Sequence, residues 1–294
     1  MKPLAFLTVA ALALAVFDAD AADKKIVFIA GKPSHGPGQH EHRAGCLLLQ
    51  KSLSNVPGIT SVVHSNGWPA SDAAFDGAAA VVIYSDGGGG HPAIQQDRLK
   101  LLGSLMEKGV GLGCIHYAVE VPKDKGGPEF LNWLGGYFET FWSVNPHWDA
   151  DFQQLPKHAV TRGVTPFKIN DEWYYHMRFA EGMKNVTPIL TAIPPDRTRG
   201  KEGESSTHGG NPHVQARKGQ PEHVMWVTER EDGGRGFGIT GAHFHRNWGD
   251  DNFRRVVLNS ILWIAKVEVP ADGVKSSISA DELSQNLDPK PARK

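Results

Sequence analysis

The sequence predicts a doubly wound α/β fold with a mainly parallel sheet and an added antiparallel portion. In the first half of the chain, short apolar runs rich in β-branched residues alternate with amphipathic helical patterns, which is typical of strand–helix–strand units with right-handed crossovers. Two later apolar runs, separated by a turn at 231–234, predict paired strands. With 294 residues and 40% hydrophobic content, the chain is long enough for one large domain or two small ones.

The individual elements follow from the period of their apolar residues. Runs that suit buried strands contain mostly valine, isoleucine and alanine, and the helical patterns between them repeat every three to four residues. The predicted strands are residues 24–30, 61–64, 79–84, 109–116, 223–228 and 236–240. The predicted helices are residues 44–53, 94–107, 129–136 and 252–266.

The first 21 residues predict a signal peptide. A lysine at position 2 precedes an apolar run over 4–17, and Ala19-Asp20-Ala21 forms a small-x-small cleavage site. The run is shorter than the roughly 20 residues that span a bilayer. We therefore expect an exported protein, periplasmic or secreted, that does not span a membrane.

The charge balance excludes some partner classes. The formal net charge is −1, which gives neither the basic footprint of a nucleic-acid-binding protein nor a polybasic membrane patch. The two cysteines, Cys46 and Cys114, permit one disulfide, but the sequence does not establish it. The oligomeric state is left open.

The segment 109–118 is the centre of the predicted site. Glycines at 109, 111 and 113 allow close approach of neighbouring elements, and the apolar run ends abruptly at Cys114 and His116. Ligands of open α/β sheets bind at the carboxyl ends of the strands. His116 is accordingly a candidate for catalysis or for metal binding.

The loop after the first strand contains His35, His40 and His42. It is rich in glycine and proline but lacks the Lys-Ser/Thr pair of a phosphate loop, which excludes a nucleoside triphosphate site. On a helix, His40 and His42 would lie about 200° apart and could not bind one ion, whereas in an irregular loop they could. His35, directly after the strand, is the best-placed metal ligand of the three.

Two later stretches combine aromatic rings with polar groups. In the stretch 137–149, Trp142 and Trp148 are suited either to core packing or to a sugar-binding platform. In the stretch 170–177, an extended strand would place Glu172, Tyr174 and His176 on one face. Glu172 is a candidate acid or base, and Tyr174 a candidate substrate contact.

The end of the second paired strand supplies further histidines. His243 and His245 would project to the same side of an extended chain, and Trp248 follows them before the last long helix. His243 is a candidate for catalysis and metal binding, while His245 and Trp248 are candidate substrate contacts. Residues 267–294 are charged, and we expect an extension there with one short helix near 280–287.

Together these stretches resemble the ThuA-like (trehalose-utilisation) family, a branch of the class I glutamine-amidotransferase-like superfamily. The similar stretches are 109–118, 171–174, 241–245 and 253–263, within a domain at 22–266. The resemblance implies a flavodoxin-like sheet and a role in carbohydrate metabolism, including trehalose-like and oxidised sugars. Amidotransferases carry a Gly-His pair after the nucleophilic cysteine and a downstream His-x-Glu, where this chain has Ile115-His116 and His243-Phe244-His245.

Three functions follow from these observations. The first is an exported hydrolase, lyase or isomerase that acts on a glycoside or keto-sugar through His116, Glu172 and His243, or through a divalent transition metal on His35, His116 and His243. The second is a sugar- or metal-binding protein without catalysis. The third is an amidotransferase-like thiol hydrolase that uses Cys114.

Overall fold

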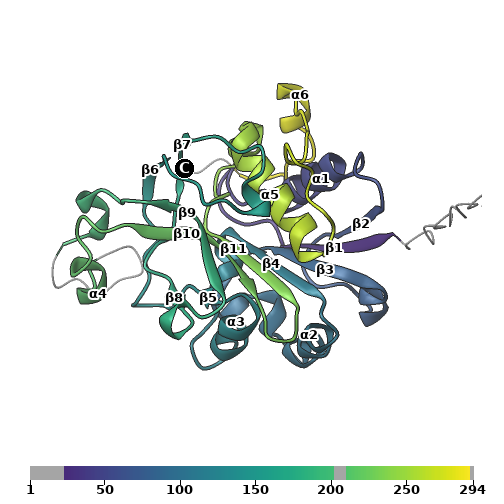
Figure 1. The fold of residues 1–294 in the computed structure, drawn as a ribbon, viewed down its shortest axis with the longest axis horizontal. Helices are drawn as coiled ribbons and strands as arrows, with labels where there is room; N and C mark the ends of the chain where they lie inside the picture. Colours follow the sequence, from purple (N-terminus) through teal and green to yellow (C-terminus); the bar gives the residue numbers. More distant parts are fainter. Residues whose placement is uncertain (1–22, 202–209, 292–294) are drawn as a thin grey trace, which may run out of the picture.

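The computed structural model describes residues 23–201 and 210–291, and within these ranges seven strands form one central sheet (Figure 1). The strand order is β2-β1-β3-β4-β11-β10-β9. The first five strands in this order run parallel, and β10 pairs antiparallel with both β11 and β9. The strands are β1 (Lys24–Ala30), β2 (Ile59–His64), β3 (Ala78–Tyr84), β4 (Gly111–Ile115), β9 (Val186–Ala192), β10 (Glu222–Glu229) and β11 (Arg235–Ile239). The predicted flavodoxin-like, doubly wound fold with an antiparallel portion is confirmed.

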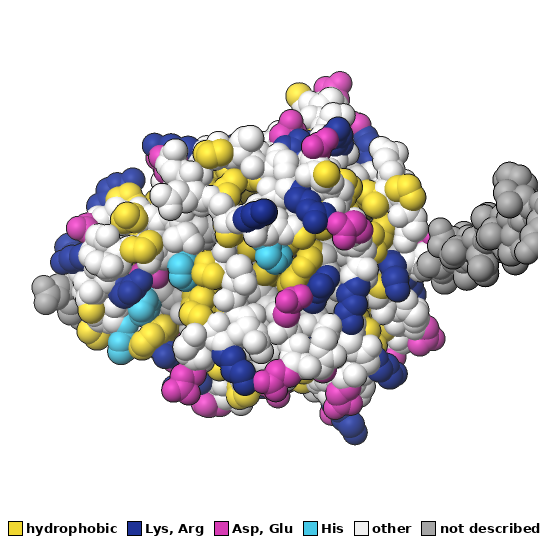
Figure 2. Space-filling model, in the orientation of Figure 1, with side chains coloured by type: hydrophobic (Ala, Val, Ile, Leu, Met, Phe, Trp, Pro, Cys, Tyr) yellow, Lys and Arg dark blue, Asp and Glu magenta, His cyan; other side chains and the backbone are white. Residues whose placement is uncertain are grey.

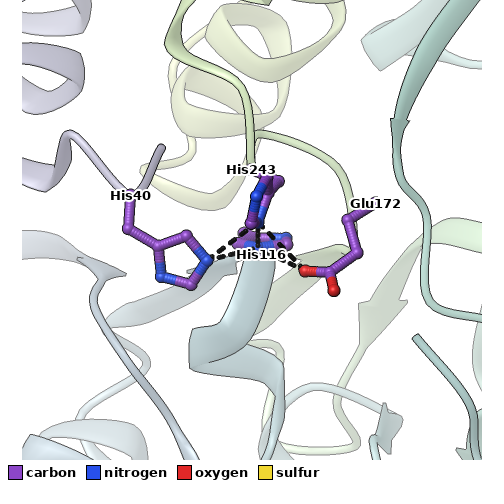
Figure 3. Close-up of side chains that lie close together, drawn as sticks. All are labelled: His40, His116, Glu172 and His243. Carbon is purple, nitrogen blue, oxygen red and sulfur yellow. Dashed lines mark hydrogen bonds and ion pairs between the residues drawn. The ribbon is translucent and has the colours of Figure 1, made fainter. Parts of the chain in front are cut away.

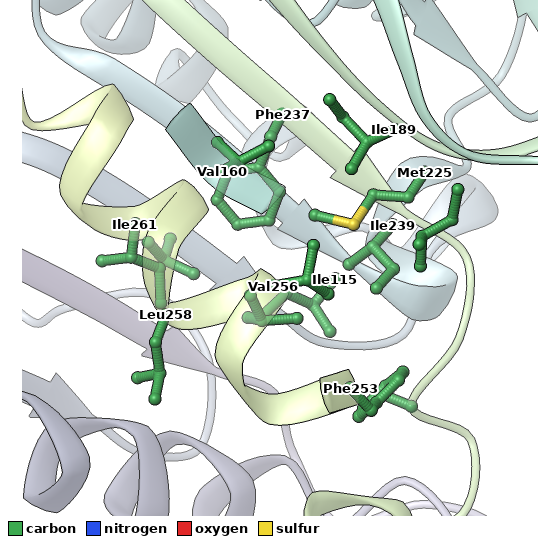
Figure 4. Packing of buried hydrophobic residues seen from close by; sticks show 14 of the residues in the cluster. Ile115, Val160, Ile189, Met225, Phe237, Ile239, Phe253, Val256, Leu258 and Ile261 are labelled. Carbon is green, nitrogen blue, oxygen red and sulfur yellow. The ribbon is translucent and has the colours of Figure 1, made fainter. Parts of the chain in front are cut away.

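Helices cover both faces of the sheet. In Figure 1, α1 (His42–Leu53) and α5 (Asp251–Ile264) lie on one side, and α2 (Arg98–Glu107) and α3 (Gly127–Trp133) lie on the other. Each side has its own cluster of buried apolar residues. In Figure 4, apolar side chains of α5 pack beside Ile115 of β4 and Phe237 and Ile239 of β11. Burial on both faces explains why these strands have continuous apolar sequences.

Two short ribbons and two short helices complete the strands and α-helices of the described residues. β6 (His147–Phe152) and β7 (Phe167–Glu172) form one antiparallel ribbon, and β5 (Gly136–Tyr137) pairs with β8 (Arg178–Phe179) in the other. The helices are α4 (Pro212–Gln215) and α6 (Ala280–Leu283). The ribbon of β6 and β7 positions Glu172, its last residue.

The glycines of the central strand are needed for close packing. A Cβ atom on Gly113 would lie 2.2 Å from the ring of Phe237, and one on Gly111 would lie 2.3 Å from the backbone oxygen of Ile264. Both distances are far inside van der Waals contact. Gly113 therefore lets the ring of Phe237 on the neighbouring strand cover β4.

Several predicted boundaries differ from the observed ones for local reasons. The helix predicted from residue 94 begins at Arg98, because Gln96 has a φ of +53° and separates it from a 3₁₀ turn at Pro92–Ile94. The strand predicted over 170–177 ends at Glu172. The helix predicted near 280–287 covers only Ala280–Leu283, and the last long helix ends two residues before Lys266, whose φ is +57°.

Other predictions concern the ends and the surface of the chain. The signal-peptide prediction falls on residues outside the described ranges. No described helix combines the length and the apolar character that a membrane crossing requires.

On the face drawn in Figure 2, basic and acidic side chains are interspersed. Cys46 and Cys114, both in the described part of the chain, are free and buried, so the permitted disulfide is not formed.

We predict that buried His91 makes the fold sensitive to acid. Its Nδ1 accepts from the amide of Ala93 (3.0 Å) and its Nε2 donates to the oxygen of Ala118 (3.1 Å). Burial lowers its pKa to about 4, although the bond to Ala118 acts in the opposite direction. Between this value and the ordinary histidine pKa of about 6.5, the unfolded chain binds more protons than the folded chain. The contribution of neutral His91 to the free energy of unfolding is therefore fully present above pH 6.5 and is lost as the pH falls toward 4.

Urea denaturation of the wild type and of His91→Gln at pH 7 and pH 4.5 would measure this effect. We expect the acid-induced loss of unfolding free energy to be about 2–3 kcal/mol smaller in the variant, because glutamine does not titrate. Equal losses in the two proteins would contradict the assignment.

Candidate metal centre

Four polar side chains from distant parts of the chain meet at the carboxyl edge of the sheet (Figure 3). His40 lies in the loop after β1, His116 directly follows β4, and His243 lies four residues beyond β11. Glu172 reaches the same point from the end of β7. The parallel strands β1, β4 and β11 end at the same edge of the sheet, so residues up to 203 positions apart become neighbours.

The donor atoms of these four residues form a compact group. The Nε2 atom of His40 lies 3.0 Å from Nε2 of His116 and 3.0 Å from Nδ1 of His243, and the last two atoms are 3.3 Å apart. The Oε2 atom of Glu172 lies 3.5 Å from His116 Nε2 and 3.0 Å from His243 Nδ1. All four side chains are buried.

Hydrogen bonds outside the group fix the protons on two of the rings. His40 Nδ1 lies 2.7 Å from a carboxylate oxygen of Asp86, and His116 Nδ1 lies 2.7 Å from the backbone oxygen of Thr240. Both partners are acceptors, so in the neutral rings the proton sits on Nδ1 and the lone pair on Nε2. The two Nε2 lone pairs then face each other at 3.0 Å, where neither can donate a hydrogen bond to the other.

This donor set fits a divalent transition metal. In tetrahedral coordination with metal–ligand bonds of about 2.0–2.1 Å, the ligand atoms are about 3.3–3.4 Å apart, and the five separations given above are 3.0–3.5 Å. Neutral imidazoles with a carboxylate are typical ligands of such ions. The carboxylate on His40 and the backbone carbonyl on His116 are also the usual outer partners of metal-binding histidines.

The local charges keep the donors in the forms that bind a cation. Burial lowers the pKa of His40 far below its ordinary value, and the neighbouring His116 lowers it further. Burial acts to raise the pKa of Glu172, but the neighbouring imidazoles of His116 and His243 outweigh it and hold that pKa well below its ordinary value. The imidazole of His40 is therefore neutral and Glu172 is ionised at neutral pH.

A buried carboxylate, Asp171, holds the segment that bears His243. Its oxygens accept the backbone N–H groups of Ala242 (2.7 Å), His243 (3.0 Å) and Phe244 (3.3 Å), and also the side-chain amide of Asn247 (2.8 Å). Ala242 has a φ of +89°, a strained value for a residue with a Cβ atom. The hydrogen bonds to Asp171 stabilise this strained turn.

The other two histidine segments are strained as well. His40 has a φ of +46° and His116 a φ of +57°, both in the left-handed region that favours glycine. Strain of this kind persists only where the surrounding structure enforces it, and it concentrates at functional sites. The three histidines therefore owe their convergence to backbone conformations that their own sequence disfavours.

The structure brings three of the predicted site residues together and places a fourth beside them. His116, Glu172 and His243 are members of the cluster, and the hydroxyl of Tyr174 lies 3.3 Å from His116 Nε2. His35 lies outside these four, where its ring stacks on His40 at 3.5 Å and its Nδ1 is 3.8 Å from Asp86. His40, rather than His35, thus completes the cluster, while His35 belongs to a second group with His40 and Asp86.

The remaining predicted contacts lie elsewhere. Trp142 packs against the guanidinium of Arg178 (3.4 Å) and the rings of His176 and His213. Because β7 ends at Glu172, the predicted common face does not extend to His176. The ring of His245 turns to the backbone oxygen of Leu283 instead of sharing a side with His243, and Trp148 and Trp248 are fully buried in the core.

Cys114 is enclosed within β4. Its side chain is completely buried, and burial raises the pKa of its thiol, so the reactive thiolate is disfavoured. It is also absent from both groups of metal-binding side chains found among residues 23–201 and 210–291. The geometry gives no support to a nucleophilic role.

Three candidate functional residues were missed from the sequence as site members. His40 completes the cluster, Asp86 orients its ring, and His147 stands at the exposed side, with Nε2 3.6 Å from Glu172 Oε1. The glycine-rich loop was the available signal for His40, because it permits the irregular backbone that a helix would not. For Asp86 and His147 the only signal in the sequence was their position next to a strand, because Asp86 follows β3 and His147 begins β6.

Comparison with known proteins agrees with this fold. A family model described as ThuA, trehalose utilisation, matches residues 29–264. The structure is similar to that of a ThuA-like protein from Bacteroides uniformis, with 14% identity, a TM-score of 0.59, and coverage of 84% of this chain and 93% of that one. A ThuA-like protein from Parabacteroides merdae gives 15% identity, a TM-score of 0.57, and coverage of 88% and 94%, respectively. No curated protein matches the sequence significantly.

The role of Asp171 can be tested by Asp171→Asn. An amide at this position presents N–H groups to backbone N–H groups that now bind oxygen, so we expect a loss of about 2–4 kcal/mol in the free energy of unfolding. Urea denaturation at pH 7 would measure it, with Asp149→Asn on the exposed side of β6 as the control. A change for Asp171→Asn as small as that of the control would show that the turn does not depend on this carboxylate.

Proposed function

From the premise that the chain belongs to the ThuA family of trehalose utilisation, we propose that it is a metal-dependent enzyme acting on a glycoside or keto-sugar. The observation that carries this proposal is the opposition of the His40 and His116 lone pairs at 3.0 Å. A cation between these atoms, with His243 and Glu172 as further donors, converts an unfavourable contact into coordination.

Each residue has a distinct part in this proposal. His40, His116 and His243 hold the ion, and Glu172, ionised beside it, is the fourth donor and the group placed to accept a proton from the substrate. A bound divalent ion would act as a Lewis acid toward an oxygen of the sugar, provided that this oxygen joins the four protein donors as a further ligand. Tyr174, 3.4 Å from Glu172 Oε2, is placed to donate a hydrogen bond there.

The accessible side of the centre suits a polyhydroxylated ligand. The His147 side chain is 47% exposed, and Asn145 donates to Glu172 Oε1 (3.2 Å). Phe244, whose ring lies 5.4 Å from that of His147, adds aromatic surface. Rings beside hydrogen-bonding groups are the usual surroundings of a sugar. The products identified in the second test below distinguish hydrolysis, elimination and isomerisation.

The proposed setting is outside the cytoplasm. It rests on the sequence pattern of residues 1–21, with the lysine, the apolar run and the small-x-small site. In that setting the substrate would be an extracellular or periplasmic carbohydrate.

The first test is the metal content of the mature protein, purified without a histidine tag and measured by elemental mass spectrometry. We expect one divalent transition metal per chain, lost in His40→Ala and in His116→Ala because each change removes a donor. His64→Ala, on the edge strand β2, is the matched control and should retain the metal. Absence of metal in the wild type after incubation with zinc, manganese, iron, cobalt and nickel would refute the metal centre.

The second test is turnover of a panel of glycosides and keto-sugars by the metal-loaded protein, with products identified by mass spectrometry and NMR. Glu172→Gln should reduce kcat by about 100-fold or more, as expected for the loss of an acid–base group. The same assay with Cys114→Ala should give unchanged turnover. Binding of sugars without any product would instead establish a carbohydrate-binding protein. Loss of activity in Cys114→Ala, with activity retained in Glu172→Gln, would establish thiol chemistry.

A further inference from the structure

The C-terminal segment beyond α5 packs against the loop that carries His40. It lies outside the region matched by the family model, which ends at residue 264. In Figure 1, α6 of this segment lies near α1. Arg43 at the start of α1 donates to the backbone oxygen of Asn286 (2.7 Å), and His245 Nε2 lies 3.0 Å from the backbone oxygen of Leu283. The segment is therefore anchored on both sides of the His40 loop.

Lys290 makes the closest connection to the metal centre. Its side chain is 3% exposed, and its Nζ lies 3.2 Å from Oε1 of Glu41, which is 1% exposed. The same Nζ donates to the backbone oxygen of His40 (3.2 Å) and to that of Gln39. The ammonium group is thus buried against one carboxylate and two carbonyl groups.

Glu41 connects the same lysine to the rest of the loop. Its Oε1 accepts the amide of Gly38 (2.9 Å), and its Oε2 accepts the amide of Asp288 (2.8 Å). The loop is in turn bonded to the His243 segment, because the amide of His40 donates to the oxygen of His243 (3.0 Å). Lys290 therefore closes a network that sets the separation of two of the histidines.

We propose that Lys290 is a positioning residue that holds His40 in its metal-binding orientation. The proposal rests on the proposed metal centre. Lys290 contacts no donor atom of that centre, so it acts through the backbone of residues 39–41. His40 occupies a strained left-handed conformation (φ +46°), and the buried ammonium on its carbonyl adds to the hydrogen bonds of its amide and its ring in holding it there.

The variant Lys290→Met keeps the length of the side chain and removes its charge and its donors. It also leaves the Glu41 carboxylate buried without its cation, which can lower stability. The double variant Lys290→Met with Glu41→Gln avoids this unpaired charge and serves as a second test that keeps the fold. Lys275→Met is the matched control, because Lys275 is 79% exposed and its ion pair is with Asp272.

Two measurements test the proposal. In competition with a chromophoric chelator, we expect zinc affinity to fall about 10-fold or more in both Lys290 variants, in the range seen when outer partners of metal ligands are removed, and to be unchanged in Lys275→Met. In the metal-free proteins, nitrogen-15 spectra of the histidine side chains should show changed His40 signals in the Lys290 variants, while those of His91 stay in place. Lys290→Arg, which keeps the charge, should recover at least part of the affinity.

The outcomes separate this proposal from the one on which it rests. If the wild type binds none of the metals offered, the metal centre is refuted, and the metal-free spectra alone decide whether Lys290 positions His40. If the wild type binds zinc and the Lys290 variants bind it equally well, the positioning role is overturned and the metal centre stands. Unchanged His40 signals in folded Lys290→Met would overturn the positioning role as well.

Discussion

Two imidazole nitrogens that cannot hydrogen-bond to each other face one another at 3.0 Å, and the arrangement around them depends on this contact. The proton of each ring is committed to an acceptor on its other side, Asp86 for His40 and the carbonyl of Thr240 for His116. A structure would relieve such a contact by a small rotation unless neighbouring groups prevented it. Here the acceptors, the left-handed backbone at both histidines and the buried setting all prevent it.

Groups on several elements stabilise the strained segments that hold the histidines together. Asp171 offsets the strained turn before His243 with three backbone hydrogen bonds, and the turn is thereby tied to the neighbour of Glu172. Asp86 follows β3, the strand between β1 and β4, so its carboxylate can reach His40 from the edge where both loops begin. The parallel sheet supplies the common edge, and the polar groups between the strand ends fix the angles. Such preorganised support is what a metal or catalytic site requires.

The sequence predicted the fold better than it predicted the site, for a physical reason. Strands β1 and β3 were recognisable because burial on both faces gives a continuous apolar run, which is a local property of the chain. His116, Glu172 and His243 were also found, because each follows or ends a predicted extended segment. The sequence favoured His35 over His40 as the metal ligand, whereas the structure places His40 in the cluster of four donors. The position of the His40 ring depends on a left-handed φ at His40 and on the carboxylate of Asp86, 46 residues away, and neither is visible in the local sequence. The same limit applies to His245, because an extended chain was assumed where a 3₁₀ turn begins.

The position of Cys114 shows why the fold alone does not determine the chemistry. The fold of this family is related to glutamine amidotransferases, in which a cysteine is the nucleophile, yet this cysteine is enclosed in β4 with a thiol whose pKa is raised by burial. The residue that reaches the edge is His116, two positions later, where the backbone turns out of the strand. Two residues along a strand span roughly 6–7 Å, and here this distance separates the enclosed interior from the edge of the sheet. The edge of the sheet therefore presents imidazoles in this chain, and a group of imidazoles with an ionised carboxylate has the chemistry to bind a cation rather than to form a covalent bond to a substrate.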